Sequence, residues 1–313
     1  MMHRLLALGE PTSALIVRRT AAAQPIQHQA PYIMDIEIHD SCVSTFRMYK
    51  VKLEDHVLRE LHRAAVEAGR RGISVPSADL DAIARRTGTL QAARRAIQRL
   101  AIAERIVRIR KDLLLLPDST GLLGVNLADL IDAVAAQPYL ITGGSALQHH
   151  GLTDQHYFDA VVLVPSRVKK LSYRGQTATF LRAHPTNIWG YQEGVRPQYA
   201  QPERAIVDAI NHPRYAVSLT QAVDALLQAA TQDPTFMNRL LQTVIRYGPS
   251  AARRAGLIID RLFGAAAAAP YREHIGTNRA PILMQPSATT HGPLDTTWRV
   301  VVNAVLEPER TPA

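Results

Sequence analysis

Between residues 85 and 116 the chain reads RRTGTLQAARRAIQRLAIAERIVRIRKDLLLL. Successive side chains lie about 100° apart around a helix axis, so the first half of this stretch divides into two stripes. One stripe is apolar and holds Leu90, Ala93, Ile97 and Leu100, whereas the opposite one is polar and holds Gln91, Arg94, Arg95, Gln98 and Arg99. Thr89 is a residue type that caps helix N-termini. The pattern predicts a helix from Thr89 to about Ala103 with a basic outer face.

A β-hairpin is predicted directly after this helix. Residues 105–110 read RIVRIR, which is typical of a strand, and the leucines at 113–116 read as the returning strand. Lys111 and Asp112 suit the tight turn between them. The hairpin therefore carries a basic rim.

Two further helices are predicted before Thr89. Apolar residues recur every four positions from Leu53 to Ala65, and this run ends at Gly69. A shorter helix follows and ends at Gly88. Helix, helix, short turn, helix and β-hairpin is the element order of a winged helix-turn-helix. We therefore expect residues 46–120 to form a winged helix-turn-helix domain.

The residue types on this predicted domain suit DNA. A recognition helix enters the major groove, where Arg and Gln bond base edges, so we expect Gln91, Arg94 and Arg95 to contact bases. Side chains around the helix typically meet phosphates. The remaining candidate DNA-binding residues are Arg85, Arg86, Thr89, Arg99, Arg108, Arg110 and Lys111. The alternative is a winged helix that mediates only protein contacts.

The excess of positive charge lies mainly in the same part of the chain as the predicted winged helix. The chain carries a net charge of +9, of which +7 falls in residues 1–112 and +2 in residues 113–313. Residues 81–111 alone hold nine basic side chains against two acidic ones. Such a local field favours a polyanionic partner, and nucleic acid is the usual one. An ordinary solvated surface accounts for the charge equally well.

Composition excludes several classes of protein. The chain has 313 residues, and a hydrophobic content of 47% is too high for a disordered protein. No run of eighteen apolar residues exists, so no transmembrane helix is predicted. The single cysteine, Cys42, cannot form an internal disulfide, which fits a reducing compartment. We therefore expect a soluble cytoplasmic protein without a membrane partner.

The rest of the chain divides into three further parts. Residues 1–45 show no sustained periodicity, and we expect a poorly structured arm there. After a linker rich in glycine and proline, residues 126–264 are predicted to form a second domain that contains both helices and strands. Residues 265–313 form a tail to which the sequence assigns no role. The predicted fold class is accordingly α+β.

Three motifs follow the predicted winged helix in a fixed order. They read GGSALQHHGLTDQ at 143–155, PERAIVD at 202–208 and GPSAARRAGLIIDRL at 248–262. With the winged helix before them, they resemble the AbiEi family of antitoxins, the regulatory members of type IV abortive-infection toxin–antitoxin systems. The resemblance covers residues 53–264, and the N-terminal arm and the tail depart from the family pattern.

The resemblance implies a fold and a function. It implies a winged helix-turn-helix followed by a mixed α/β C-terminal antitoxin domain, whose motif residues are Gly143, Ser145, His150, Gly151, Glu203, Arg204, Arg253 and Arg254. It also implies a repressor of its own operator, which we expect to bind as a pair of modules on repeated half-sites. The C-terminal domain would counteract a nucleotidyltransferase-like toxin, and a stable complex with that toxin is not assumed. A winged-helix transcription factor without a toxin is the alternative.

Considered by residue type, the motif residues are expected to be architectural. Two glycines, at 143 and 144, allow a tight turn from strand to helix, and Ser145 is predicted to cap that helix. Glu203 and Arg204 follow a proline at a helix start and suit capping and an ion pair. For Arg253 and Arg254 a solvated helix face is favoured over a surface that contacts a partner.

An enzyme with a nucleotidyltransferase-like site is the competing interpretation. The GGS sequence at 143–145 is similar to the loop that holds triphosphate in those enzymes, which also need two aspartates at i and i+2 to bind Mg²⁺. Here Asp159 could be the first aspartate, but Val161 occupies the i+2 position where the second is needed. His149, His150 and His156 cluster in the sequence, but no cysteine accompanies them as a further metal ligand. We expect no catalytic residue, metal site or cofactor, and a degenerate nucleotide-binding protein is the less favoured alternative.

Overall fold

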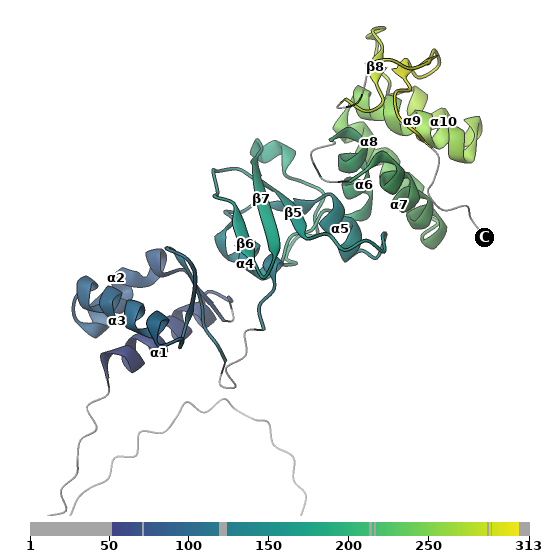
Figure 1. The fold of residues 1–313 in the computed structure, drawn as a ribbon. Helices are drawn as coiled ribbons and strands as arrows, with labels where there is room; N and C mark the ends of the chain where they lie inside the picture. Colours follow the sequence, from purple (N-terminus) through teal and green to yellow (C-terminus); the bar gives the residue numbers. More distant parts are fainter. Residues whose placement is uncertain are drawn as a thin grey trace, which may run out of the picture. The chain divides into compact units, whose positions relative to one another are not determined.

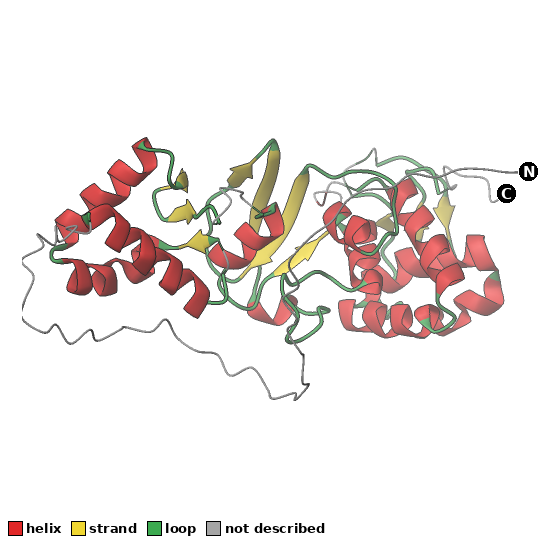
Figure 2. Cartoon of the chain, turned by 90° about the horizontal axis from the view of Figure 1, so that it is seen from below, coloured by secondary structure: helices red, strands yellow, loops and turns green. Residues whose placement is uncertain are grey.

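The computed structural model describes residues 52–306, except for 71, 119–123, 213, 214, 216, 287 and 289, and except for the side chains of 76–79 and 87. The predicted arm at residues 1–45 lies outside the described residues, as does Cys42. Helices and small sheets alternate along the described chain (Figures 1 and 2), which confirms the α+β fold class.

Three helices and a three-stranded antiparallel sheet form the first part of the described chain. The helices are α1 (Leu53–Glu67), α2 (Pro76–Thr87) and α3 (Leu90–Ile102), and the strands are β1 (Ile73–Ser74), β2 (Val107–Arg110) and β3 (Leu113–Leu115) in the order β1-β3-β2. The three helices and the hairpin lie where the sequence predicts them. The pairing of β1 with β3 was not predicted.

The run of leucines in β3 is buried on both of its faces. Leu114 and Leu116 pack with the apolar stripes of α1 and α3, whereas Leu113 and Leu115 belong to a second cluster that includes Ile131 and parts of the next sheet. Successive side chains of a strand point to opposite faces of the sheet. A strand that is covered on both faces therefore needs apolar residues at consecutive positions, which the four leucines supply. The segment after the hairpin is therefore packed against it and does not begin a separate core.

A four-stranded mixed sheet occupies the middle of the chain (Figure 2). Its elements are α4 (Leu127–Val134), β4 (Leu140–Thr142), α5 (Gly144–His149), β5 (Asp159–Val164), β6 (Leu171–Tyr173) and β7 (Gln176–Arg182), with strand order β4-β5-β7-β6. Strand β5 runs parallel to β7, and the other pairs are antiparallel. Alternate residues of β5 enter two different hydrophobic clusters, so both faces of this sheet are covered.

Helices dominate the remainder of the chain. They are α6 (Pro202–Asn211), α7 (Leu219–Gln232), α8 (Phe236–Tyr247), α9 (Pro249–Phe263) and α10 (Ala265–Arg272), after the short 3₁₀ helix η1 (Pro185–Asn187). The strands β8 (Ile282–Leu283), β9 (Leu294–Asp295) and β10 (Val300–Val301) form a small sheet in the order β8-β10-β9. Helix α6 is central, because every residue from 204 to 210 is buried.

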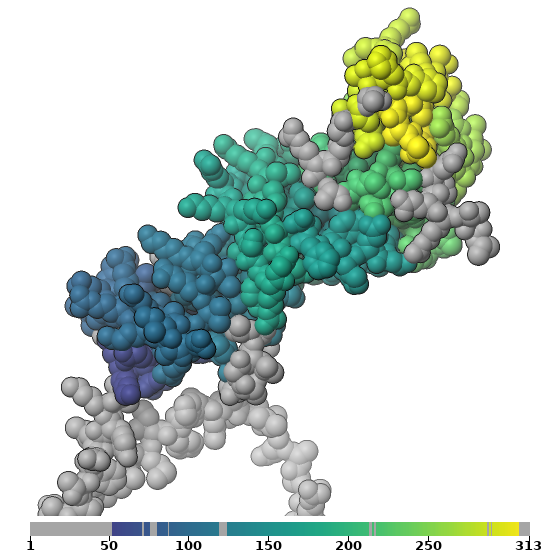
Figure 3. Space-filling model, in the orientation of Figure 1, coloured from purple at the N-terminus to yellow at the C-terminus, as the bar shows by residue number. Residues whose placement is uncertain are grey.

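The tail to which the sequence assigned no role completes this helical core. Trp298 is fully buried, and its indole Nε1 donates to Asp260 of α9 at 2.8 Å. Gly256 faces the ring so closely that a methyl group there would overlap it. In Figure 3 the yellow C-terminal segment lies against the light-green helices. The core of residues 126–264 therefore continues beyond Gly264.

Candidate nucleic-acid interface

Helix α3 presents one buried face and one exposed face. Its buried residues are Ala93, Ala96, Ile97 and Leu100, and the exposed side chains are those of Gln91, Arg94, Arg95, Gln98 and Arg99. Thr89 caps the helix, since its hydroxyl accepts a hydrogen bond from the Ala92 amide at 3.2 Å. The 3.6-residue periodicity thus places the polar stripe in solvent, as predicted.

Arg94 and Arg95 are the most available cations on this face. Both are exposed, and within the described part of the chain neither forms an ion pair or a hydrogen bond through its side chain. Each guanidinium keeps five N–H donors and a full positive charge. Arg108 and Lys111 on the hairpin and Arg85 at the end of α2 are exposed as well.

Three of the predicted DNA-binding arginines already have carboxylate partners. Arg99 pairs with Glu54 of α1, Arg86 with Glu60 at 2.7 Å, and Arg110 with Asp112 at 2.7 Å. Glu60 is a buried side chain of α1, and the hydrogen bond from Arg86 lowers the pKa of its carboxyl. The pairs of Arg86 and Arg99 join α2 and α3 to α1, and the pair of Arg110 lies within the hairpin, so all three arginines already serve the fold.

Sequence reasoning overlooked these carboxylates. Glu60 directly precedes Leu61 on the apolar side of α1, and a carboxylate next to an apolar stripe signals a partner from another helix.

The first C-terminal motif builds a strand-to-helix turn. Gly143 has a φ of +65°, and a side chain there would overlap the Tyr215 carbonyl, so only glycine fits. Helix α5 starts at Gly144 with Gly143 as its N-cap, which makes the prediction that Ser145 is the cap wrong. Ser145 lies one residue too far along the helix, and its hydroxyl instead donates to the Asp159 carbonyl at 3.4 Å.

The end of this motif fixes α5 to its surroundings. The His150 Nε2 atom is hydrogen-bonded to the Ala200 carbonyl at 2.8 Å, and the Gly151 carbonyl accepts from Gln228 of α7 at 2.8 Å. Gly151 itself adopts a φ of +66°. Both motif residues therefore connect segments that lie far apart in the sequence.

The second motif contains a buried ion pair. Arg204 and Asp208 are joined at 3.0 Å, and both side chains are almost completely buried. The Asp208 carboxylate also accepts hydrogen bonds from Thr142 at 2.6 Å and from Tyr247. Burial, together with the neighbouring Asp208, raises the pKa of the Tyr247 hydroxyl. This network joins β4, α6 and α8.

The predicted ion pair of Arg204 is thus confirmed. The Arg204 guanidinium also lies over the ring of Trp189, 4.1 Å from its centroid. Glu203 is in the first turn of α6 and pairs with Arg239 of α8 at 3.5 Å.

The prediction that Arg253 and Arg254 form a solvated helix face is wrong. Both side chains are buried. Arg253 donates to the carbonyls of Ile275, at 3.0 Å, and Ala280, at 2.8 Å, and also to that of Asn278. Arg254 donates to the Leu283 carbonyl at 2.9 Å and to Asn211 at 2.8 Å. The irregular segment between α10 and β8 carries carbonyl groups with no helical partner, and the Arg253 guanidinium donates to three of them, whereas Arg254 joins α9 to β8 and α6.

Comparisons with known proteins show a likeness of fold. No protein-family model and no curated protein matches the chain. Among solved structures, the RV2827C protein from Mycobacterium tuberculosis is similar, with a TM-score of 0.55 and 16% sequence identity over 79% of this chain and 90% of that one. An identity this low shows a shared fold and nothing about activity or ligands.

Across the described ranges, no group of three His, Cys, Asp or Glu side chains is placed to hold a metal ion. Asp159 is exposed at the start of β5, and the buried Val161 stands where a second metal-binding aspartate would be needed. Within those same ranges, none of the helices combines the length and the apolarity needed to cross a bilayer.

Proposed function

We propose that residues 53–116 form a winged helix-turn-helix whose recognition helix is α3. The order of helices, the short β1 before α2 and the hairpin after α3 support this proposal. The observation that carries it is the exposed face of α3, where Arg94 and Arg95 have no intramolecular partner within the described chain. Guanidinium groups in this state bind guanine edges and phosphates.

The protein, on this proposal, is a cytoplasmic antitoxin similar to the AbiEi family. It represses its own operator as a pair of modules on repeated half-sites, while its C-terminal domain counteracts a nucleotidyltransferase-like toxin. The support for the antitoxin role is the resemblance of the three motifs. Their side chains hold α5, α6 and α9 in place, which supports a common architecture for the domain.

The DNA-binding part is tested by an electrophoretic mobility shift. The full chain is titrated against duplex DNA from upstream of its own gene and against a scrambled duplex, at several salt concentrations. Specific retention that falls with salt is expected, because each phosphate contact releases counterions. Arg94→Ala/Arg95→Ala should abolish the preference for the upstream duplex.

A charge-matched control separates recognition from general basicity. Arg261→Ala/Arg279→Ala removes the same charge from two exposed positions remote in sequence, and it should bind like the unmodified protein. Equal losses in the two double variants, or equal binding of both duplexes by the unmodified protein, would reject α3 as a recognition helix.

The antitoxin role needs a separate assay. Expression with the neighbouring nucleotidyltransferase-like gene should restore growth, and Arg94→Ala/Arg95→Ala should restore growth equally while failing to repress a promoter fusion. If the protein represses but never restores growth, it is a transcription factor without a toxin.

A further inference from the structure

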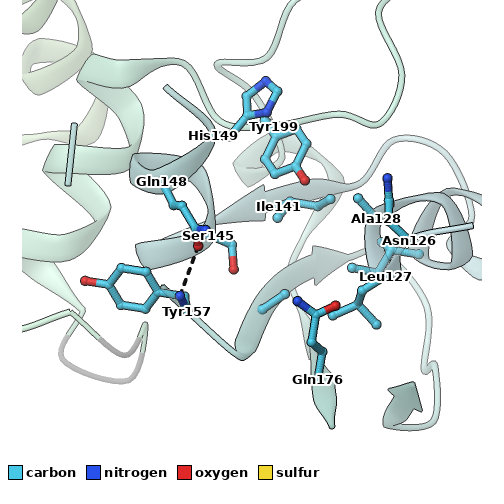
Figure 4. A pocket seen from close by; sticks show the side chains of 12 residues that line it. Asn126, Leu127, Ala128, Ile141, Ser145, Gln148, His149, Tyr157, Gln176 and Tyr199 are labelled. Atoms are coloured by element: carbon cyan, nitrogen blue, oxygen red, sulfur yellow. Dashed lines mark hydrogen bonds between the residues drawn. The ribbon is translucent and has the colours of Figure 1, made fainter. Parts of the chain in front are cut away.

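A hollow of about 250 Å³ lies between the mixed sheet and the helices α4 and α5 (Figure 4). It is outside the proposed DNA-binding face, and three of its lining residues, Ser145, Gln148 and His149, belong to the first C-terminal motif. Asn126 and Leu127 come from the start of α4, Ser145 and His149 from α5, and Gln176 from β7. Sequence reasoning missed it, because these residues share no spacing.

None of the side chains that line the hollow carries a charge at neutral pH. They are aliphatic, aromatic, amide or hydroxyl groups, apart from the imidazole of His149. Burial lowers the pKa of His149, and so does the adjacent His150, so its ring is neutral at pH 7. A phosphate or carboxylate would find no countercharge in the lining, which favours an uncharged ligand.

The shape of the lining suits a planar ring. Ile141, Leu127 and Ala160 supply an apolar surface, and Ala160 is short enough to leave room above the sheet. Next to Ile141, which forms an isolated β-bridge with Tyr199, the rings of His149 and Tyr199 are stacked, with centroids 3.9 Å apart and planes 3° from parallel. Aliphatic surface beside an aromatic ring is a setting in which unpaired bases are stacked.

The rim offers hydrogen-bonding groups that the protein does not use. The Gln176 amide and the Tyr199 hydroxyl have no hydrogen bond among the described residues, and Figure 4 shows them on opposite sides of the hollow. Asn126 accepts from the Asp129 amide at 2.9 Å through its oxygen, which leaves its NH₂ group available. Gln148 differs, since its oxygen accepts from the Tyr157 amide at 3.0 Å and its nitrogen contacts His156.

We propose that this hollow binds a nucleobase through its edges and its face. Amide and hydroxyl groups can match the donor and acceptor pattern of a base edge, while the apolar floor covers the ring. The volume is below the roughly 300–1,000 Å³ of drug-sized sites, which suits one base with its sugar. The base comes either from a free nucleoside or from an unpaired position in a single strand. The inference does not depend on DNA binding by α3.

Calorimetric titration of the full chain tests the proposal. The four ribonucleosides and inorganic triphosphate are compared in the Arg94→Ala/Arg95→Ala background, where α3 does not contribute. At least one nucleoside should bind with a Kd of about 1 mM or tighter, and triphosphate alone should not bind. Failure of all four nucleosides, or binding of triphosphate alone, would overturn the proposal.

Conservative variants locate the binding. Gln176→Ala/Tyr199→Phe removes an amide and a hydroxyl without removing any buried ring, and it should weaken nucleoside binding about tenfold. Gln192→Ala, at an exposed amide in a loop, is the control and should leave binding unchanged. Equal affinity in both variants, with unchanged thermal midpoints, would place the ligand elsewhere and reject this site.

A short single-stranded oligonucleotide distinguishes the two sources of the base. If the oligonucleotide binds more tightly than the best nucleoside, and Gln176→Ala/Tyr199→Phe removes this binding, the natural ligand is an unpaired base in a strand. Binding of the nucleoside with no gain from the strand assigns a free nucleoside.

Discussion

Two pairs of adjacent arginines, one on α3 and one on α9, differ in their exposure and in their partners. On α3, Arg94 and Arg95 extend into solvent with no described partner, whereas Arg253 and Arg254 on α9 are buried and donate to backbone and amide oxygens. Both pairs are adjacent arginines in amphipathic helices. The difference lies in what surrounds them, because Arg253 and Arg254 of α9 meet oxygen atoms of neighbouring segments, whereas the outer face of α3 that carries Arg94 and Arg95 is exposed.

This comparison shows how to separate a binding arginine from a structural one. Removal of a structural arginine, or of its partner, should reduce stability, while removal of a binding arginine should reduce affinity and leave stability unchanged. The following substitutions test that distinction.

The largest loss of stability is expected for Asp208→Asn. The substitution leaves the buried Arg204 guanidinium without its carboxylate, and breaking a buried pair in this way costs about 3–5 kcal/mol. Urea denaturation measures the change in the free energy of unfolding. A loss below about 1 kcal/mol would mean that the network with Thr142 and Tyr247 compensates, and it would contradict the structural role.

Arg253→Met should follow, with a loss of about 2–4 kcal/mol. The carbonyls of Ile275 and Ala280 lose the Arg253 donor, whereas that of Asn278 keeps Arg299, and each unsatisfied buried group costs about 1–3 kcal/mol before the segment relaxes. Arg261→Met on the same helix is exposed and should change stability by about 0.5 kcal/mol or less. If the two variants unfold at the same denaturant concentration, Arg253 is not a structural arginine.

On α3 the expected change is in affinity. Arg94→Ala should weaken specific DNA binding about tenfold and reduce the salt slope, because a base or phosphate contact is lost. Arg99→Ala should weaken it less, since Arg99 already pairs with Glu54. Fluorescence anisotropy at two salt concentrations measures both, and denaturation should show that Arg94→Ala is as stable as the unmodified chain. A larger effect for Arg99 would shift the interface toward the far end of α3.

The smallest effect concerns the ion pair between Glu60 of α1 and Arg86 of α2, and it depends on pH. Arg86 lowers the pKa of Glu60 below its ordinary value of 4.5, so the carboxylate stabilises the folded state above that value. The contribution is lost as the pH falls below 4.5 through the folded-state pKa. Glu60→Gln should therefore reduce stability by about 1 kcal/mol or less at pH 7, and this difference should shrink on acidification. A difference that grows at low pH would contradict the assignment.

Local patterns in the sequence predicted the elements around α3 well. The stripe of α3, its Thr89 cap and the hairpin turn depend on residues a few positions apart, which the sequence displays directly. Strand β1 was missed because two residues have no periodicity, and its pairing with Leu115 depends on a contact across some forty positions.

The positions of Arg253 and Arg254 could not be predicted in the same way. Two adjacent arginines usually lie in solvent, and most of their acceptors here are backbone carbonyls, which leave no trace in residue type. Trp298, which packs against Gly256 and donates to Asp260, is one of the contacts that join the C-terminal segments to α9. The candidate base site was missed for a similar reason, since Gln176 of β7 and Tyr199, which bridges Ile141 of β4, line one hollow only through tertiary contacts.

The late position of Trp298 in the chain also has a consequence for synthesis. Translation adds about 5–20 residues per second, so Trp298 is made roughly 2–8 s after Gly256, to which it docks. During that interval α9 lacks the ring that packs against Gly256, whereas the helices around α3 have already been synthesised. The C-terminal core is therefore the last part of the described chain that can close.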